Sequence, residues 1–220
     1  MINSDLYTQI TALPLLQGIS AEHIVQMRER GILRIISMEP EEGNIIVLGQ
    51  QCNTLTMLMR GTLQCTTNGD AWIMTEEIHA PAIIEEDALW SLSQKYSHTY
   101  APKTEGSILV VDRRHVMHTM MQDEVFRINL LTRMATRIER LSKSVQVRQI
   151  EGIAHKIERF VQSISYTPSM PKRLDIKMTT LAQIIGETRL SVSRVLHQMQ
   201  EEGQISLARE QIVFHQFKLQ

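Results

Sequence analysis

Residues 178–200 constrain this chain most, because they predict two helices joined by a tight turn. An apolar face at helical spacing marks the first helix, and Thr179 or Thr180 is expected to cap its start. Gly186 is placed at the turn, where a left-handed backbone costs glycine little, and Thr188 is expected to cap the second helix. This order predicts a helix-turn-helix, a unit whose second helix enters the major groove of DNA.

The second predicted helix separates an apolar stripe from a polar and basic side. The stripe consists of Val192, Val195, Leu196 and Met199. On the other side, Arg189 and Arg194 can each pair with two acceptors of a guanine edge or bind a phosphate. An ordinary helical hairpin with a solvated basic face would show the same pattern and stays an alternative. The predicted DNA-binding residues are Thr179, Thr188, Arg189, Leu190, Ser191, Ser193, Arg194 and His197.

The residues that follow favour the DNA-binding interpretation. Ile205 and Ser206 precede a polar tip at 208–211, and the apolar run 212–214 comes next. Two short apolar runs around a polar turn predict a β-hairpin. A hairpin in this place is typical of the wing of a winged helix-turn-helix.

The amino-terminal half shows another pattern, in which short apolar runs alternate with turn residues. Residues 4–30 are predicted to be helical, with Ser20 as a cap. Glycines at positions such as Gly43, Gly49 and Gly61 supply turns between short strands. Many short strands with regular punctuation predict a β-roll or jelly roll over 32–111. The predicted strands are 35–36, 45–47, 55–59, 63–66, 72–75 and 108–111.

Residues 112–146 are predicted to form one long helix with a narrow apolar seam. The seam residues step by three and four positions, as in the heptad repeat of a parallel coiled coil. A dimer seam is the favoured interpretation, and a helix packed only on the core of its own domain is the alternative. Residues 147–164 predict another amphipathic helix, and 166–173 predict a loop. The predicted dimer seam consists of Leu131, Met134, Ile138, Leu141 and Val145.

The charge of the chain is divided unevenly, although its net value is only −1. Residues 1–123 hold 8 basic and 15 acidic residues, a net charge of −7, whereas residues 124–220 hold 15 basic and 9 acidic residues, a net charge of +6. A basic half that contains the predicted helix-turn-helix fits a DNA partner. The sequence has no apolar run of about 20 residues and no secretion signal, so a cytoplasmic protein without membrane association is expected.

The two cysteines, Cys52 and Cys65, are too few for a disulfide framework. They are also too few to hold an iron–sulfur cluster through four thiolates. The sequence contains no nucleophile elbow, no phosphate-loop glycine pattern and no metalloenzyme motif. We therefore predict that the chain is not an enzyme and has neither catalytic residues nor a metal site.

In three segments the chain resembles the family of the cAMP receptor protein and the fumarate–nitrate regulator, which are bacterial dimeric transcription factors. These segments are the helix-turn-helix with its wing, the long helix, and the glycine-punctuated segment 41–65. The resemblance implies an α+β fold with a cyclic-nucleotide-binding-like β-roll (jelly roll) that senses an effector over 1–111. The implied fold continues with a dimerisation helix over 112–146 and ends with a winged helix-turn-helix DNA-binding domain over 147–220. The resemblance also implies a homodimer on a palindromic double-stranded DNA operator, with RNA polymerase as a partner if the protein is an activator.

The implied effector pocket departs from the cyclic-nucleotide pattern of that family. The Gly-Glu turn of the family falls within 81–87, which has no glycine, and its Arg-Ser pair falls at Tyr96 and Ser97. An arginine can pair two phosphate oxygens, but here it is missing, and the acidic residues 85–87 would repel a phosphate. An effector other than cAMP is therefore expected. The implied pocket residues are Met57, Met59, Tyr96, Ser97, Leu141 and Ser142.

Haem is an alternative ligand, because imidazole and thioether groups ligate haem iron. His115 and His118 could also share a metal ion. Against this, methionines usually fill irregular cores, and histidines at this spacing usually lie on a solvated helix face. A haem-dependent nitric oxide or redox sensor that regulates a stress response is thus a second hypothesis. Its candidate ligands are Met57, Met59, Met74, His79, His98, His115, Met117, His118, Met120 and Met121.

The predicted recognition helix also mixes two patterns of the family. Arg189 matches the arginine of the cAMP-receptor type, and Ser193 with Arg194 matches the fumarate–nitrate type. The family's glutamate, which accepts a hydrogen bond from cytosine, is replaced by Leu190. A leucine can contact a thymine methyl group instead. A third hypothesis follows from this loss, namely a ligand-binding module that no longer binds DNA.

Overall fold

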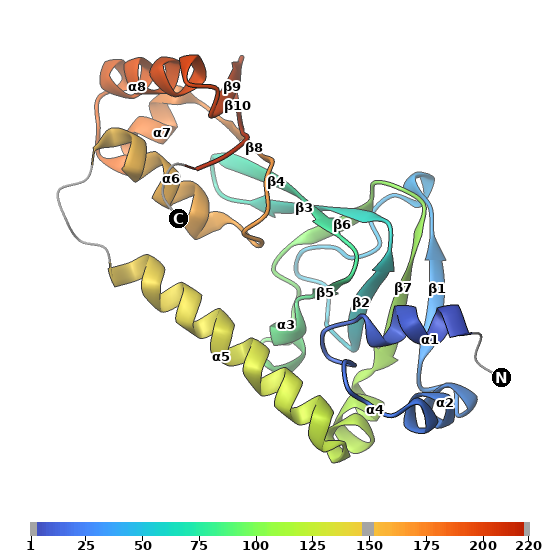
Figure 1. Ribbon diagram of the computed structural model, residues 1–220. Helices are drawn as coiled ribbons and strands as arrows, with labels where there is room; N and C mark the ends of the chain where they lie inside the picture. The colour runs from blue at the N-terminus through green and yellow to red at the C-terminus, as the bar shows by residue number, and fades with distance from the viewer. Residues whose placement is uncertain (1–3, 147–151, 218–220) are drawn as a thin grey trace. The chain divides into compact units, whose positions relative to one another are not determined.

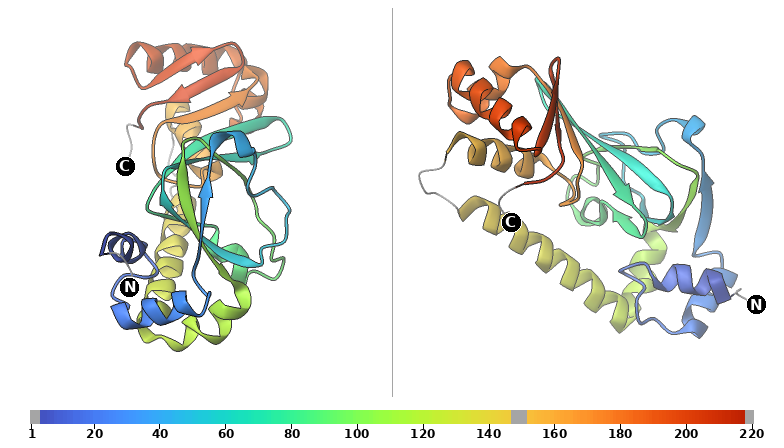
Figure 2. Two further views of the ribbon diagram at one scale, coloured as in Figure 1. Left: turned by 90° about the vertical axis from the view of Figure 1, so that its right-hand side faces the viewer. Right: turned by 45° about the horizontal axis from the view of Figure 1, so that its top comes forward.

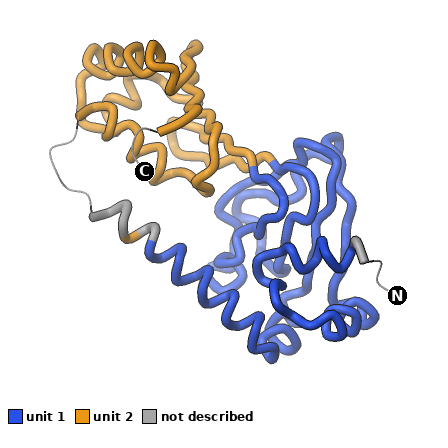
Figure 3. Tube along the Cα trace, viewed as in Figure 1, with its two compact units in different colours: residues 1–63, 78–139 blue, residues 64–77, 140–220 orange. Residues whose placement is uncertain are grey.

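The computed structural model describes residues 4–146 and 152–217, and the chain forms two compact units (Figure 3). The first unit consists of Met1–Leu63 and Ile78–Glu139, and the second of Gln64–Glu77 and Arg140–Gln220. The segment Gln64–Glu77 thus groups with the carboxyl-terminal part of the chain. The domain boundaries expected after residues 111 and 146 stay a prediction.

Two helices open the first unit, α1 (Ser4–Thr11) and α2 (Ala21–Glu29). The Ser20 hydroxyl accepts a hydrogen bond from the backbone N–H of His23 at 3.2 Å, which satisfies a free donor of the first turn of α2. This confirms the predicted cap. The apolar side chains buried by this segment are Ile10, Leu13, Leu15, Leu16, Ile19, Ile24 and Met27.

An antiparallel four-stranded sheet forms the centre of the first unit, in the order β1-β7-β2-β5 (Figure 1). Its register pairs Ile36 with Ile108 and Met57 with Leu109. Side chains of β2 and β7 are buried along most of both strands, because the inner strands of the sheet are covered. The strands are β1 (Arg34–Met38), β2 (Thr54–Arg60), β5 (Ala82–Ile84) and β7 (Gly106–Asp112), with the short 3-10 helix η1 (Pro40–Glu42) after β1.

Three local predictions for this unit differ from the structure. The strand expected at 45–47 is reduced to a single bridge between Ile46 and Tyr100. Residues 81–87, where the resemblance placed the family's Gly-Glu turn, contain β5 and the start of α3 (Glu86–Trp90). Strand β6 (Thr99–Pro102) was not predicted, because its four residues are too few to mark a strand by sequence, although Tyr100 and Pro102 are alternately buried in the structure.

The long helix expected over 112–146 is interrupted, so that prediction was wrong in its first third. The chain forms α4 (Arg113–His118), the 3-10 helix η2 (Met120–Gln122) and then α5 (Glu124–Gln146). The break coincides with Asp123, whose carboxylate accepts a hydrogen bond from the N–H of Phe126 at 3.0 Å. Aspartate at this place favours a new helix start over continuation.

The second unit combines three helices with a sheet (Figure 2). Its strands follow the order β3-β4-β8-β10-β9, with β4 antiparallel to β8. Strand β8 lies partly within the segment expected to be a loop, and the hairpin β9–β10 confirms the predicted wing. The elements are β3 (Thr62–Asn68), β4 (Trp72–His79), α6 (Ile153–Ile164), β8 (Lys172–Ile176), α7 (Met178–Ile185), α8 (Arg189–Glu201), β9 (Ile205–Ala208) and β10 (Gln211–Phe214).

We predict that Gly106→Ala destabilises the first unit by about 1–3 kcal/mol, the usual cost of overpacking. A Cβ at Gly106 would collide with the carbonyl oxygen of Arg60 and with the Met38 side chain, and backbone cannot move aside as a flexible side chain can. Urea unfolding measures the change. Gly152→Ala is the matched control, because a Cβ there meets nothing within 4 Å. Equal stabilities of the two variants would contradict the prediction.

Candidate nucleic-acid interface and effector site

The turn between α7 and α8 is built as the sequence predicts. Gly186 has a left-handed φ of 70°, which an L side chain rarely adopts. The Thr188 hydroxyl accepts a hydrogen bond from the N–H of Ser191 at 3.2 Å and so caps α8. The cap expected for α7 was wrong, since that helix begins at Met178 after Lys177, and no side chain caps it.

Helix α8 turns one side into the core of the second unit. Val192, Leu196 and Met199 are at most 2 % exposed and pack with residues of α6, α7 and the sheet. Val195 is only partly buried against the same core. These contacts confirm the predicted apolar stripe and leave the opposite side of the helix in solvent.

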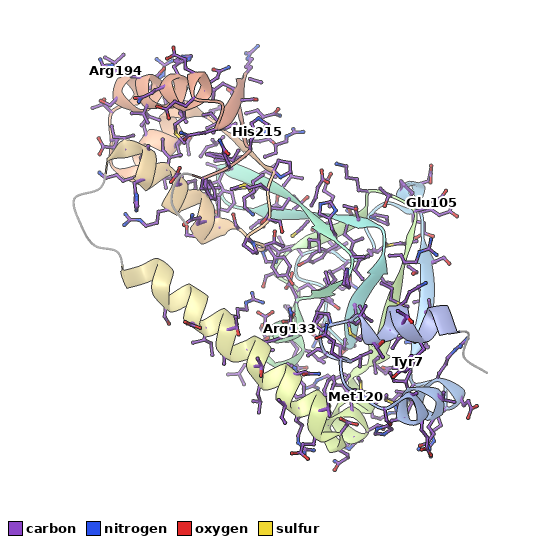
Figure 4. The ribbon with its side chains drawn as sticks, in the orientation of Figure 1. Tyr7, Glu105, Met120, Arg133, Arg194 and His215 are labelled. Atoms are coloured by element: carbon purple, nitrogen blue, oxygen red, sulfur yellow. The ribbon has the colours of Figure 1, made fainter. Side chains whose placement is uncertain are left out.

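None of the eight predicted DNA-binding residues is buried. Arg189, Leu190, Arg194 and His197 are exposed on α8, and Leu190 is 71 % exposed although it is apolar. Figure 4 labels Arg194 on this helix. The structure also brings Thr179 of α7 into the same hollow as Arg189 and His197. The other members are Thr188, which is exposed, and Ser191 and Ser193, which are partly exposed.

This hollow has a volume of about 500 Å³ and lies among the start of α7, helix α8 and the wing. Its floor is apolar and includes Leu196 and Ile212. Lys177 and Gln200 add a cation and an amide to its lining, and neither residue was predicted from the sequence. The predicted wing could have pointed to them, because a wing folds back beside the recognition helix.

The residues implied for an effector pocket do not share one environment. Met57 and Met59 of β2 and the side chain of Tyr96 are buried, whereas Ser97 is exposed. Burial raises the pKa of Tyr96 to about 12. Ser142 is exposed, and the Leu141 side chain lies outside the described residues. The buried members belong to the buried apolar residues of the first unit.

A buried carboxylate stands at the centre of this region. Glu85 is 2 % exposed, and its side chain accepts hydrogen bonds from the N–H of Ser97 at 2.7 Å and the hydroxyl of Tyr100 at 2.8 Å. A ring nitrogen of His98 lies 2.6 Å from the same carboxylate. Burial raises the pKa of Glu85, but the hydrogen bonds of His98, Ser97 and Tyr100 outweigh it, and the pKa is lowered. From the sequence, these acidic residues were expected to repel a phosphate, but the inward orientation of Glu85 was not predicted.

Two ion pairs join α3 to α5. Arg133 lies 2.8 Å from the buried carboxylate of Glu86, and Arg137 lies 2.6 Å from Asp87. Arg133 is labelled in Figure 4, on α5. The second carboxylate oxygen of Glu86 and the indole nitrogen of Trp90 are both buried without a hydrogen-bond partner. These side chains therefore have unused hydrogen-bonding capacity beside α5.

The candidate haem ligands are spread over the chain. Met74 lies in the core of the second unit, whereas a ring nitrogen of His79 contacts the Thr62 hydroxyl at 3.1 Å. His118 and Met117 are exposed. Within 4–146 and 152–217, no three His, Cys, Asp or Glu residues gather as metal ligands would. The remaining candidates are Met57, Met59, His98, His115, Met120 and Met121, and haem stays a hypothesis.

The apolar seam of α5 faces solvent in the single chain. Leu131 and Ile138 are 68 % and 63 % exposed, Met134 is partly exposed, and Ile128 on the same helix is also exposed. The side chains of Leu141 and Val145, also predicted for the seam, lie outside the described residues. Across the part of the chain that is described, no helix is both long and apolar enough to cross a membrane.

We predict that Glu85 stabilises the first unit in a pH-dependent way. A carboxyl with a lowered folded-state pKa contributes stability above its ordinary value of 4.5 and loses it as the pH falls through the folded-state value. The difference in unfolding free energy between the wild type and Glu85→Gln should therefore narrow below about pH 4.5. Urea unfolding from pH 7 to pH 3 measures it, with the exposed Glu105→Gln as control. A difference independent of pH would contradict the prediction.

Comparison with known proteins agrees with this architecture. Residues 153–218 match the Crp-like helix-turn-helix domain. The Thermus thermophilus catabolite activator protein is 18% identical, with 92% of this chain and 93% of that one covered and a TM-score of 0.53. A protein from Eubacterium rectale described as a transcriptional regulator of the crp/fnr family is 17% identical, with coverages of 94% and 96% and a TM-score of 0.51.

The likeness extends to the first unit. The sensor domain of the transcriptional regulator DNR from Pseudomonas aeruginosa is 14% identical, with 66% of this chain and 96% of that domain covered and a TM-score of 0.50. No curated protein matches the sequence. The structural matches establish the fold, and the domain match identifies the helix-turn-helix. The chain therefore has the fold of the Crp/Fnr DNA-binding transcription regulators and carries a Crp-like helix-turn-helix domain at residues 153–218.

Proposed function

We propose that the protein is a homodimeric, sequence-specific DNA-binding transcription regulator whose effector is not cAMP. The observation that carries this proposal is the orientation of α8. The apolar side of this helix is buried in the second unit, and Arg189, Arg194 and His197 of the same helix are exposed. Arginine is the side chain best suited to read guanine in the major groove, because its planar fork matches two acceptors.

The recognition chemistry proposed for α8 combines two kinds of contact. Arg189 and Arg194 bind guanine edges or phosphates, and Leu190 contacts a thymine methyl group. The partly exposed Ser191 and Ser193 are small enough to let the backbone approach the DNA. Thr179 and Thr188 supply hydroxyls to the backbone phosphates. In this arrangement the replacement of an acidic residue by Leu190 changes the operator sequence without abolishing DNA binding.

The proposed dimer is supported by the exposed seam of α5. Ile128, Leu131 and Ile138 leave an apolar stripe in solvent on one helix of the single chain. A second copy of the same helix would bury it in a parallel pair. Dimerisation also suits the helix-turn-helix, since a dimeric helix-turn-helix protein binds two half-sites about one DNA turn apart.

The proposed effector class follows from the charge around α3. Glu85 and Glu86 are buried acids, and the donors that converge on Glu85 are already engaged. An anionic cyclic phosphate would meet these carboxylates instead of free donors. We therefore propose an effector without a phosphate at this place, and it acts by binding one of two conformational states more tightly than the other.

We predict that Arg194→Ala weakens operator binding by about 1–3 kcal/mol, roughly 5–150-fold, because one base or phosphate contact is lost. The operator is first selected from random DNA, and fluorescence anisotropy then measures affinity at fixed salt. Arg28→Ala, an exposed cation on α2, is the charge-matched control. Equal affinities of both variants would show that α8 does not read the DNA and would favour a module that has lost DNA binding.

We predict that Leu131→Glu converts the dimer to a monomer at micromolar concentration, because two carboxylates would face each other across the seam. Sedimentation equilibrium measures the mass. Thr136→Glu is the control, since Thr136 is exposed away from the seam and its hydroxyl bonds the carbonyl of Thr132. If Leu131→Glu stayed dimeric, the partner surface would lie elsewhere on the chain.

A further inference from the structure

The sheet of the second unit includes strand β4, which is distant in sequence from its partner strand β8. Residues 72–76 of β4 pair with 172–176 of β8, antiparallel and in unbroken register from Trp72–Ile176 to Glu76–Lys172. The two strands lie side by side in both sets of ribbon views (Figures 1 and 2). The hairpin Gln64–Glu77 therefore extends the sheet of the DNA-binding unit on the side opposite the wing.

One face of β4 packs into the apolar core of this unit. Met74 is fully buried in it, and the ring of Trp72 packs edge-to-face on Phe160 with centroids 5.9 Å apart. The alternate residue Ile73 is 44% exposed, as the two-residue period of a strand requires. The docked hairpin thus completes an apolar core that its absence would open.

A buried ion pair secures the end of this strand. Glu76 and Lys172 are each 1% exposed, and the ammonium group donates to the Glu76 carboxylate. That carboxylate also accepts hydrogen bonds from the N–H groups of Tyr166 and Thr167, at 2.6 and 3.0 Å. Burial lowers the pKa of Lys172, which the charge of Glu76 opposes. Each ion is stable here only while the other is present, because an unpaired buried charge costs several kcal/mol.

The hairpin belongs to both units through its chain connections. Thr62 of β3 and His79 of β4 lie in the first unit, whereas Gln64–Glu77 lies in the second. A shift of β3 or β4 in the first unit therefore reaches Glu76 through a few residues of continuous strand. Release would return both ions to water together with the backbone groups of the β4–β8 ladder.

We propose that the hairpin Gln64–Glu77 docks reversibly on the DNA-binding unit, and we call this hairpin the latch. Strand pairing with β8 and the Glu76–Lys172 ion pair hold it in the docked state. The latch has a docked and a released state, and both units stay folded in each. The existence of the two states does not depend on the proposed function. Only the consequence that operator binding favours one of the two states rests on it.

A reversible disulfide that holds the hairpin in its docked state, called the lock below, tests the latch in the full-length protein. Thr75 and Arg173 are opposite each other in the register and are not buried, so Thr75→Cys with Arg173→Cys places two thiols within reach of a disulfide. The native Cys52 and Cys65 are buried. Oxidised and reduced samples of the same protein are then compared, with Thr75→Cys alone as control.

Hydrogen exchange of the backbone amides of 72–76 and 172–176 is the first measurement. The latch predicts exchange at least tenfold slower in the oxidised than in the reduced protein, with the amides of α8 unchanged. Glu76→Ala should speed exchange in the same residues without exposing α8, and Glu77→Ala on the next residue should not. Exchange that is unaffected by the lock, or that rises throughout the unit in Glu76→Ala, would overturn the proposal and make the hairpin a permanent strand.

Operator affinity is the second measurement. Locked protein and Glu76→Ala should differ at least tenfold in Kd, whichever state the operator prefers. Equal Kd values would overturn the control of DNA binding by the latch. If the wild-type protein bound no operator at all, the proposed function would fail, and the exchange measurement would still decide whether the latch exists.

Discussion

The burial of one side of α8 is the interaction on which the rest of the second unit depends. Val192, Leu196 and Met199 pack into a core shared with α6, α7 and the sheet. Each such side chain contributes about 1.5–3 kcal/mol when it is removed from water. Turning the helix about its axis would expose this stripe and bury Arg189 and Arg194, whose charges would then be unpaired. The core thereby determines which residues of α8 face solvent, and this exposed side is the one that we propose binds DNA.

A second constraint acts in the first unit, where acidic groups are placed inside. Glu85 is held by a backbone N–H, a tyrosine hydroxyl and His98, and Glu86 is paired with Arg133 of α5. Such groups tolerate burial only while their partners stay in place. A ligand that competes for Arg133, or that donates to the unused oxygen of Glu86, would therefore change how α3 and α5 are joined. These ion pairs link the helix with the apolar seam directly to the buried acidic residues of the first unit.

Local signals were sufficient to predict the helix-turn-helix. Gly186 needed a left-handed backbone, Thr188 had a free amide to cap, and the wing followed within a few residues. The Crp-type fold was predictable because these signals combine with the glycine-punctuated strands and the long helix. The exposed apolar side of α5 was also predictable from a local pattern, since Leu131 and Ile138 are one heptad apart in the sequence.

What the sequence did not show depends on contacts between distant residues. The pairing of β4 with β8 joins positions about 100 residues apart, and nothing near Glu76 indicates Lys172 as its partner. The inward orientation of Glu85 depends on Ser97, His98 and Tyr100, which approach only when β6 has formed. The helix break at Asp123 was missed because the apolar pattern continues across it, whereas the capping hydrogen bond acts against continuation.

The proposed function requires that a dimer presents two copies of α8 to DNA. Selection of bound fragments from random double-stranded DNA, followed by sequencing, is the decisive experiment. We expect one enriched palindrome with half-sites about one helical turn apart. Guanine positions in each half-site should be lost from the motif selected by Arg189→Ala or Arg194→Ala. Enrichment of no sequence, or of a single unrepeated half-site, would contradict the proposed function.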